Sequence, residues 1–284
     1  MTEFHAQDPT RGKSVGVALD PTTIVGKVVV GFIVGTIVGL TGIGGGMLLL
    51  PLLISVLGVP PIIAVGSDAV INCATKIGAG WLHFRRGNVD RRLVQRLAYG
   101  SIPGAIFGVI FLSWVRSAYG DRVNDFLKVF IGILLIVIPT AFLFKKYLVL
   151  PQTTFGTTDE NRYPFGVTLI GFIAGNLVGI TSIGAGSVIL MLLFVLYGYS
   201  PTVLIGTDIV HGVLLAGLTG LLQRGFGNVD LTLTAFVLIG SIPGGLLGAH
   251  LTKHVPSHRL RQGLCATLVA VGARMLWVTI RHAK

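Results

Sequence analysis

Two short glycine-rich stretches interrupt apolar sequence and carry groups that could bind an anion. The first is TGIGGG at 41–46, and the second is TSIGAG at 181–186. Each glycine disfavours a helix by about 1 kcal/mol relative to alanine, and an apolar run that restarts a helix follows each break. A helix start offers unpaired N–H groups and a partial positive charge, which glycines allow an anion to approach closely. The breaks therefore predict two half-sites for one small anion.

The predicted substrate-binding residues lie in the two breaks, directly after the second break, and in the third apolar segment of the first half, at about 61–83. They contribute backbone N–H groups, hydroxyls, an amide and one ammonium group. The set is Thr41, Gly42, Gly44, Gly45, Gly46, Asn72, Lys76, Thr181, Ser182, Gly184, Gly186 and Ser187. Tight helix packing is the alternative reading, and we assign the stripe Gly31, Gly35 and Gly39 to packing. Three adjacent glycines exceed what packing needs, so the breaks are interpreted as a site.

Ionisable residues inside apolar segments form the second group of candidates. Asp68 and Asp208 occupy matching positions, and a buried aspartate costs several kcal/mol at mid-membrane unless it pairs or lines a pathway. Asp68, Asn72 and Lys76 share one helix face, and Asp208 shares a face with His211. Histidine can carry a proton near neutral pH. We predict a proton-coupling role for Asp68, Asp208 and His211, with helix capping or structural pairing of the aspartates as the alternative.

Composition places these residues in a membrane. Of 284 residues, 52% are hydrophobic and 12% are charged, against about 25% charged in a soluble domain. The net charge of +11 gathers in short loops such as RRGNVDRR at 85–92, as the positive-inside rule predicts for cytoplasmic loops. The sequence therefore predicts an all-α polytopic transmembrane helical bundle in contact with the lipid bilayer, and the basic charge does not indicate a nucleic-acid partner.

The chain is duplicated. GFIVGTIVGLTGIGGG at 31–46 recurs as GFIAGNLVGITSIGAG at 171–186, and GSIPG at 100–104 recurs at 240–244, both 140 residues later. Such repeats are typical of secondary transporters. The predicted organisation has four parts: an N-terminal tail at 1–23, a first transmembrane repeat at 24–144, a linker at 145–163 and a second repeat at 164–284.

Each half contains five apolar segments, of which the second is short for a full crossing. In the first half they span about 24–41, 45–58, 61–83, 92–114 and 126–144. Five crossings per half would make the repeats inverted and place the Lys- and Arg-rich loops on the cytoplasmic side, which we favour. Four crossings plus a re-entrant piece, with parallel repeats, is the alternative.

Smaller motifs are interpreted as structural. Asp90 and Asp230, in the repeated GNVD, are expected to cap the helix that follows, and Pro103 and Pro243 to kink it. The cysteines lack metal-ligand spacing, so no metal or other cofactor is predicted. The only candidate machinery for an intramembrane enzyme is Asp208, His211 and nearby serines. It contains no activated nucleophile, so we predict that the protein is not an enzyme.

Taken together, the ordered and duplicated motifs resemble the sulfite exporter TauE/SafE family of membrane permeases. The resemblance rests on TGIGGG, GSD and GTD, GNVD and SIPG, and covers roughly residues 24 to 280. It implies a multi-pass transporter of the cell inner membrane for sulfite, sulfonates or related small anions. We expect secondary transport by proton-coupled alternating access, with a small-anion channel as the alternative. Whether the protein forms a homo-oligomer is left open.

Overall fold

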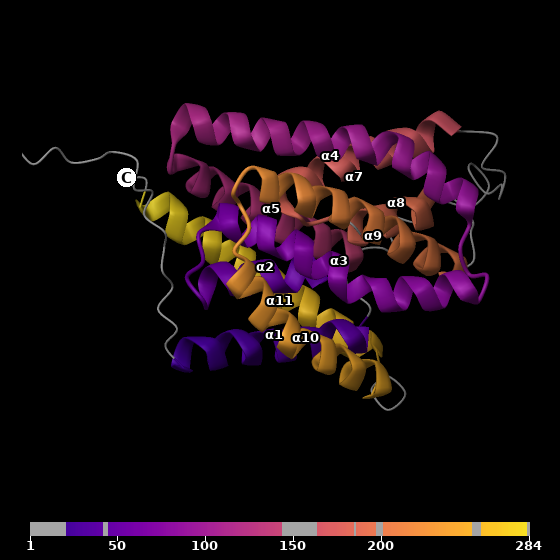
Figure 1. The fold of residues 1–284 in the computed structure, drawn as a ribbon, viewed down its shortest axis with the longest axis horizontal. Helices are drawn as coiled ribbons and strands as arrows, with labels where there is room; N and C mark the ends of the chain where they lie inside the picture. Colours follow the sequence, from indigo (N-terminus) through magenta and orange to yellow (C-terminus); the bar gives the residue numbers. More distant parts are fainter. Residues whose placement is uncertain are drawn as a thin grey trace, which may run out of the picture.

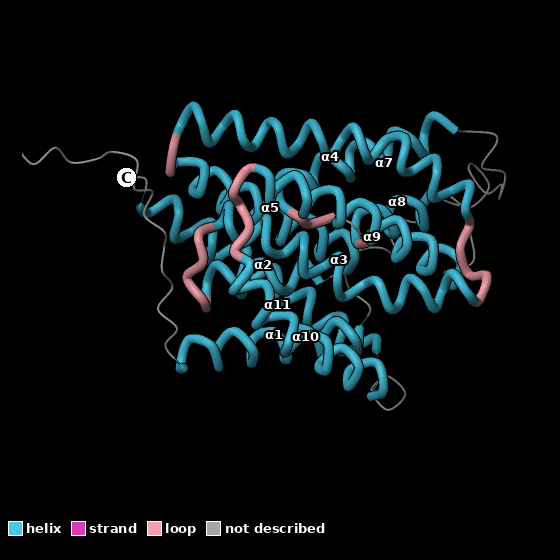
Figure 2. The backbone as a smooth tube through the Cα atoms, viewed as in Figure 1, coloured by secondary structure: helices cyan, strands magenta, loops and turns pink. Residues whose placement is uncertain are grey.

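The computed structural model describes residues 21–41, 45–143, 164–184, 186–196, 201–251 and 257–282. These ranges form α-helices joined by short turns and contain no strand, which confirms the all-α prediction (Figures 1 and 2). The helices of the first half are α1 (Pro21–Thr41), α2 (Gly45–Ser55), α3 (Pro61–Arg85), α4 (Arg91–Tyr119) and α5 (Arg122–Leu143). Those of the second half are α7 (Pro164–Thr181), α8 (Ser187–Leu196), α9 (Pro201–Gly225), α10 (Leu231–Leu251) and α11 (Ser257–His282).

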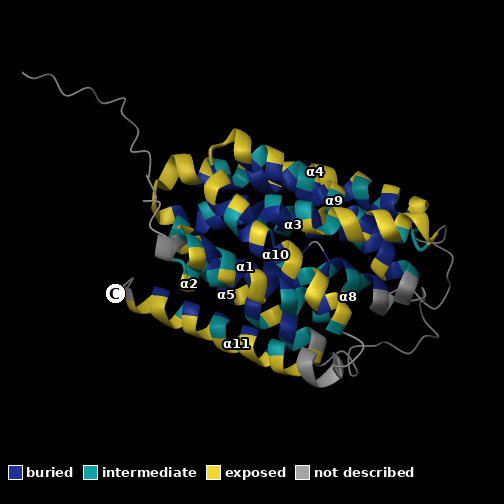
Figure 3. Ribbon diagram, turned by 60° about the horizontal axis from the view of Figure 1, so that its bottom comes forward, coloured by how far each residue is buried: buried dark blue, intermediate teal, exposed yellow. Residues whose placement is uncertain are grey.

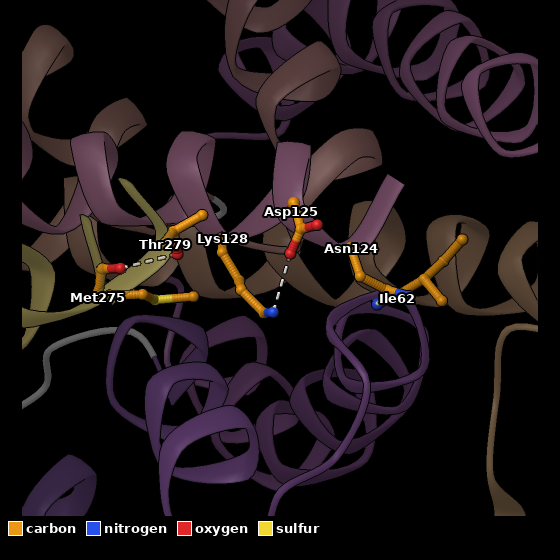
Figure 4. Close-up of polar contacts among 6 residues, drawn as sticks. All are labelled: Ile62, Asn124, Asp125, Lys128, Met275 and Thr279. Carbon is orange, nitrogen blue, oxygen red and sulfur yellow. Dashed lines mark hydrogen bonds and ion pairs between the residues drawn. The ribbon is translucent and has the colours of Figure 1, made fainter. Parts of the chain in front are cut away.

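The helix starts follow local sequence rules. Four helices begin with proline, whose missing N–H group would be unpaired at that position in any case. The predicted GNVD caps are confirmed: the Asp90 carboxylate accepts hydrogen bonds from the N–H groups of Arg92 and Leu93, and Asp230 accepts one from Leu233. At the start of α3, the Ile62 N–H donates to the Asn124 side chain of α5 at 3.2 Å, and Figure 4 shows these residues together.

Two helix pairs, α1 with α10 and α4 with α7, form the outer edges of the view in Figure 1. A methyl group added at Gly31, Gly35 or Gly39 would overlap a backbone carbonyl of α10, in the order Val237, Ser241 and Gly245. Residue numbers rise together in the two helices, so α1 and α10 run parallel. The packing role predicted for this glycine stripe is confirmed.

The α4–α7 pair repeats this arrangement. Gly171 and Gly175 of α7 press against the carbonyl groups of Leu97 and Ser101 of α4, again in rising order. Every residue in this pair is offset by 140 positions from its counterpart in the α1–α10 pair. The two repeats therefore exchange matching helices: the first helix of each packs against the fourth helix of the other.

The third helices of the repeats, α3 and α9, pack together at the centre (Figure 1). A methyl group added at Gly220 would lie 3.0 Å from Val70, and one at Gly212 would lie 3.0 Å from Lys76 Nζ. Numbers rise in one helix while they fall in the other, so the pair is antiparallel.

Two matching hydrogen bonds fasten these central helices to the turns of the opposite repeat. The Asp230 N–H donates to the Ser67 hydroxyl oxygen, and the Asp90 N–H donates to the Thr207 hydroxyl oxygen, both at 3.0 Å. Gly66 leaves room for the carbonyl of Asn228 in the same turn. The polar residues around the repeated aspartates of α3 and α9 thus serve partly to join the halves.

Six helices of the described ranges are long and apolar enough to cross a membrane. They are Pro61–Arg85, Arg91–Tyr119, Arg122–Ala141, Val203–Gly225, Leu231–Leu251 and Gln262–Arg281; three shorter apolar helices are Ile24–Leu40, Gly45–Ser55 and Phe165–Thr181. Large apolar side chains such as Trp114 and Trp277 lie exposed on the outside, and Figure 3 shows a largely exposed outer face on α11. Such a surface suits lipid contact, and the chain is a multi-pass membrane protein.

Candidate functional site

The second glycine-rich stretch interrupts a helix, as predicted, and the first lies where one described helix ends and the next begins. The first lies between α1, whose last residue is Thr41, and α2, whose first is Gly45. Gly42 and Gly44 lie outside the described residues. The second lies between Thr181 of α7 and Ser187 of α8. Here Ser182 has φ +57°, Gly184 +124° and Gly186 +123°, so the chain turns through conformations that glycine tolerates and most residues do not.

The two breaks meet inside the protein. A Cβ atom added at Gly46 would lie 2.8 Å from Asp68 Oδ2, 2.9 Å from the Ser182 carbonyl oxygen and 3.1 Å from Asn72 Nδ2. A Cβ atom added at Gly45 would lie 2.7 Å from Asn72 Oδ1. The first turn of α2 is therefore surrounded by polar atoms from α3 and from the opposite break. Such an environment can satisfy unwound backbone inside a membrane.

The carboxylate of Asp68 is held by neutral donors. Asn72 Nδ2 donates to Asp68 Oδ2 at 2.8 Å, and the Ser182 side chain also interacts favourably with this carboxylate. Oδ1 of Asp68 is buried without a hydrogen-bond partner among the described residues. Asp68 is the eighth residue of α3, which begins at Pro61, and Asp208 lies at the same place in α9. The alternative that these aspartates cap helices is wrong; Asp68 instead pairs with its neighbour one turn away.

Thr181 serves the second break itself. Its hydroxyl donates to the Leu177 carbonyl at 2.7 Å and accepts a hydrogen bond from the Ile183 N–H at 3.2 Å. Both bonds satisfy backbone groups where α7 ends. In this arrangement the hydroxyl shapes the break, and its hydrogen is directed to the helix.

A second polar cluster lies between α3 and α9. Lys76, half-buried on α3, extends its ammonium group over Gly212 of α9, where an added Cβ would lie 3.0 Å from Nζ. Lys76 interacts electrostatically with Asp208 and also with Asp68. Asp208 and His211 are both buried, and Oδ1 of Asp208 has no hydrogen-bond partner among the described residues. The predicted ionisable residues thus come together across the repeats, with Lys76 linking them.

Sequence reasoning missed Ser101, which connects α4 to this cluster. Its buried hydroxyl lies 2.8 Å from Nε2 of His211, while Nδ1 of His211 has no hydrogen-bond partner among the described residues. Ser101 belongs to the repeated SIPG motif, whose proline predicts a kink but whose serine gives no sign of its histidine partner. The equivalent serine, Ser241, faces the first repeat, where Ile71 stands in place of the histidine, and its hydroxyl has no such partner in the described ranges.

A hydrogen-bonded chain that sequence reasoning also missed leads toward the second break. Arg116 of α4 donates to the Asn228 side-chain oxygen, and Asn228 Nδ2 donates to Gln223 Oε1 at 2.7 Å. Gln223 Nε2 in turn donates to the Gly179 carbonyl near the end of α7 at 3.1 Å. Asn228 lies in the second GNVD, but only the fold reveals its partners.

Comparison with known proteins gives one family and several relatives. The family model described as "Sulfite exporter TauE/SafE" matches residues 28–275. The chain is 35% identical to "Probable membrane transporter protein YjnA" of Bacillus subtilis, over 88% of this chain and 98% of that protein. It is 25% identical to "Probable membrane transporter protein YdhB" of the same organism, over 88% and 99% of the two chains. A "Probable membrane transporter protein" of Haemophilus influenzae is 25% identical, over 87% and 95%. No solved structure matches.

Proposed function

Because this chain belongs to the sulfite exporter TauE/SafE family of membrane transporters, we propose that it is a proton-coupled secondary transporter of small sulfur-containing anions. Its substrate is sulfite, a sulfonate or a similar anion. The observation that carries the proposal is the meeting of the two breaks around Gly46, beside Asp68 and Asn72 and near Lys76. Helix starts and an ammonium group supply positive potential, and the buried aspartates and His211 supply groups that exchange protons.

The exchanged helix pairs support alternating access between two inverted repeats. The helices α1 and α10 run parallel, the chain reverses direction at the short turn 226–230 between α9 and α10 (Figure 1), and α9 is antiparallel to α3. The chain also reverses direction at the turn 86–90 between α3 and α4, and α7 runs parallel to α4. Followed in this order, the directions make α7 opposite to α1. Repeats of opposite direction around a shared central site can rock to expose that site to either side.

Uptake into proteoliposomes tests the proposal. The panel contains sulfite, a sulfonate, sulfate and a carboxylate, each with and without a proton gradient. We expect saturable uptake of a sulfur-containing anion that a proton gradient accelerates. Gly45→Val should abolish it, because the added side chain would collide with Asn72 where the breaks meet. Asp208→Asn should remove the response to the gradient. Normal transport by a folded Gly45→Val protein would overturn the proposed site.

Counterflow separates a carrier from a channel. A carrier loaded with unlabelled substrate accumulates labelled substrate transiently, because each turnover exchanges one molecule for another. We expect this overshoot for the wild-type protein. Conductance without counterflow would replace the carrier with a small-anion channel that uses the same breaks as its filter.

A further inference from the structure

The two halves of the central site are not equivalent, and the difference lies at one position. Asp68 of α3 is followed one turn later by Asn72, which holds its carboxylate. Asp208 of α9 is followed one turn later by Gly212, which has no side chain. The space that an amide occupies in the first half is taken in the second half by Nζ of Lys76, which reaches across from α3. The group one turn after Asp68 is thus a neutral amide, whereas the group at the matching place after Asp208 is a cationic ammonium.

The surroundings of the two carboxylates follow this difference. Asp68 is held by Asn72 and the Ser182 side chain and lies against the first turn of α2, whose partial positive charge favours an ionised carboxylate. These donors favour the ionised form of the Asp68 carboxyl, whereas its burial favours the neutral form. For Asp208 the counter-charge is Lys76, and its Oδ1 atom is buried without a hydrogen-bond partner in the part of the chain that the structure describes. Asp208 is therefore the carboxylate that depends on Lys76.

We propose that the ammonium group of Lys76 recognises the charge of the anion. When Asp208 takes up a proton, this ammonium group leaves the Asp208 carboxyl and pairs with the bound anion. This inference rests on the proposed function and states which residue binds the anion and which takes up the proton. Without substrate, the ammonium of Lys76 is balanced by the Asp208 carboxylate. When the anion binds, it takes over the ammonium, and Asp208 becomes a neutral acid. The anion lies on the α9 side, at the start of α8, which packs against α9 as α2 packs against α3.

Charge balance in a low-dielectric site drives the exchange. Two anions beside a single ammonium group would leave an uncompensated buried charge, which is far more costly than protonating one of them. One proton therefore enters with each monovalent anion. α7 and α8 contain no charged or titratable residue, and α4 presents Ser101. The other titratable groups that face α9 on this side are Cys73 and His83 of α3 and Asp90 of the turn that follows α3; His83 lies beside Gly206, and the Asp90 N–H binds Thr207. A proton on His83 would add a cation and would not remove the carboxylate that competes with the anion for Lys76. Asp68 keeps its own donors. His211 binds Ser101 through Nε2, and its free Nδ1 atom can contact the anion only if the ring carries a hydrogen there.

The test measures binding and proton uptake together in purified protein, with methanesulfonate as the probe because its charge does not change with pH. Calorimetry gives the affinity, and a pH indicator in weakly buffered solution counts protons. We expect the wild type to take up about one proton per bound anion near neutral pH. Asp208→Asn should bind with little or no proton uptake, whereas Asp68→Asn should still take up about one proton.

Variants at Lys76 test the recognition step. Lys76→Ala should weaken methanesulfonate binding at least about tenfold. Lys76→Arg should recover much of the loss because it keeps the charge. The double variant Lys76→Ala/Gly212→Asn, which gives α9 the amide of α3, should fold as well as Lys76→Ala without recovering affinity. The matched control is Cys73→Ala, in the same α3–α9 contact, which should change neither affinity nor proton count. Melting temperatures show which variants fold.

The outcomes separate the two proposals. If the wild-type protein binds and transports neither methanesulfonate nor sulfite, the proposed function fails and this inference falls with it. If the wild type binds methanesulfonate but proton uptake is lost in Asp68→Asn and kept in Asp208→Asn, the inference is overturned while the transporter stands. Unchanged affinity in folded Lys76→Ala protein would overturn it equally.

Discussion

At the scale of single residues, the absence of side chains matters as much as their presence. Gly46 stands where a carboxylate oxygen, a carbonyl oxygen and an amide nitrogen converge within 3.1 Å of the place a Cβ would take. Of these, the Ser182 carbonyl belongs to backbone at positive φ and cannot move without reshaping the second break. One methyl group at Gly46 would therefore separate the two breaks.

We predict that Gly46→Ala lowers anion uptake in proteoliposomes at least about tenfold, because the methyl group pushes Asp68 and Ser182 away from α2. The control is Gly78→Ala on α3, where an added Cβ meets no atom within 4 Å. That variant should transport as the wild type does. Equal uptake by both alanine variants would contradict the tight contact at Gly46.

We predict that Ser101→Ala lowers the free energy of unfolding in detergent by about 1–3 kcal/mol, because Nε2 of His211 would be left buried without a partner. The measurement is the midpoint of thermal unfolding. The matched control is Ser241→Ala at the equivalent position of the second repeat, whose hydroxyl has no such partner among the described residues. We expect it to be neutral or slightly stabilising. A similar loss in both variants would show that the histidine contact contributes nothing.

At the scale of helices, two parallel pairs hold the repeats together through glycine. Glycines lie on both partners: Gly35 of α1 faces the Ser241 carbonyl of α10, and Gly244 of α10 faces the Phe32 carbonyl of α1. Backbones that approach this closely gain dispersion contacts, which drive helix association in lipid, where apolar burial from water does not operate. The exchange of helices between repeats thus depends on a surface without side chains.

We predict that Gly35→Ala destabilises the protein by about 1–3 kcal/mol, because its methyl group would overlap the Ser241 backbone and force α1 and α10 apart. Gly26→Ala on the same helix is the control, since its Cβ would meet the Leu57 side chain at an ordinary 3.9 Å. The measurement is the midpoint of thermal unfolding in one detergent. A midpoint for Gly35→Ala no lower than that of Gly26→Ala would refute the close packing.

At the scale of the whole molecule, the helix directions are compatible with two repeats whose matching helices run in opposite directions. The hydrogen bonds that Ser67 accepts from the second GNVD turn and that Thr207 accepts from the first are equivalent under exchange of the repeats. In an inverted arrangement these two attachments lie toward opposite membrane surfaces. Each could then hold the halves together on one side while the other side opens.

We predict that Arg86 and Phe226, equivalent exposed residues of the two GNVD turns, face opposite sides of the membrane. Each is replaced by cysteine in a Cys73→Ala/Cys265→Ala background. A membrane-impermeant maleimide applied to sealed, oriented vesicles should label Arg86→Cys from the cytoplasmic side and Phe226→Cys from the other. Labelling of both from one side would establish parallel repeats and rule out the inverted arrangement.

The sequence by itself was enough to determine that this is a membrane protein whose motifs recur at an offset of 140 residues, with a glycine-rich stretch in each half. Composition indicates the membrane as solvent, and the offset of 140 residues is visible in the sequence itself. The GNVD caps and the glycine stripe follow from local sequence, so all of these features could be predicted without coordinates. Only the tertiary structure decided that the breaks meet each other, that Lys76 fills the space above Gly212, and that Ser101 binds His211. The physical reason is that these contacts join residues far apart in the chain, and no periodicity within one helix records which helix of the other repeat it will face.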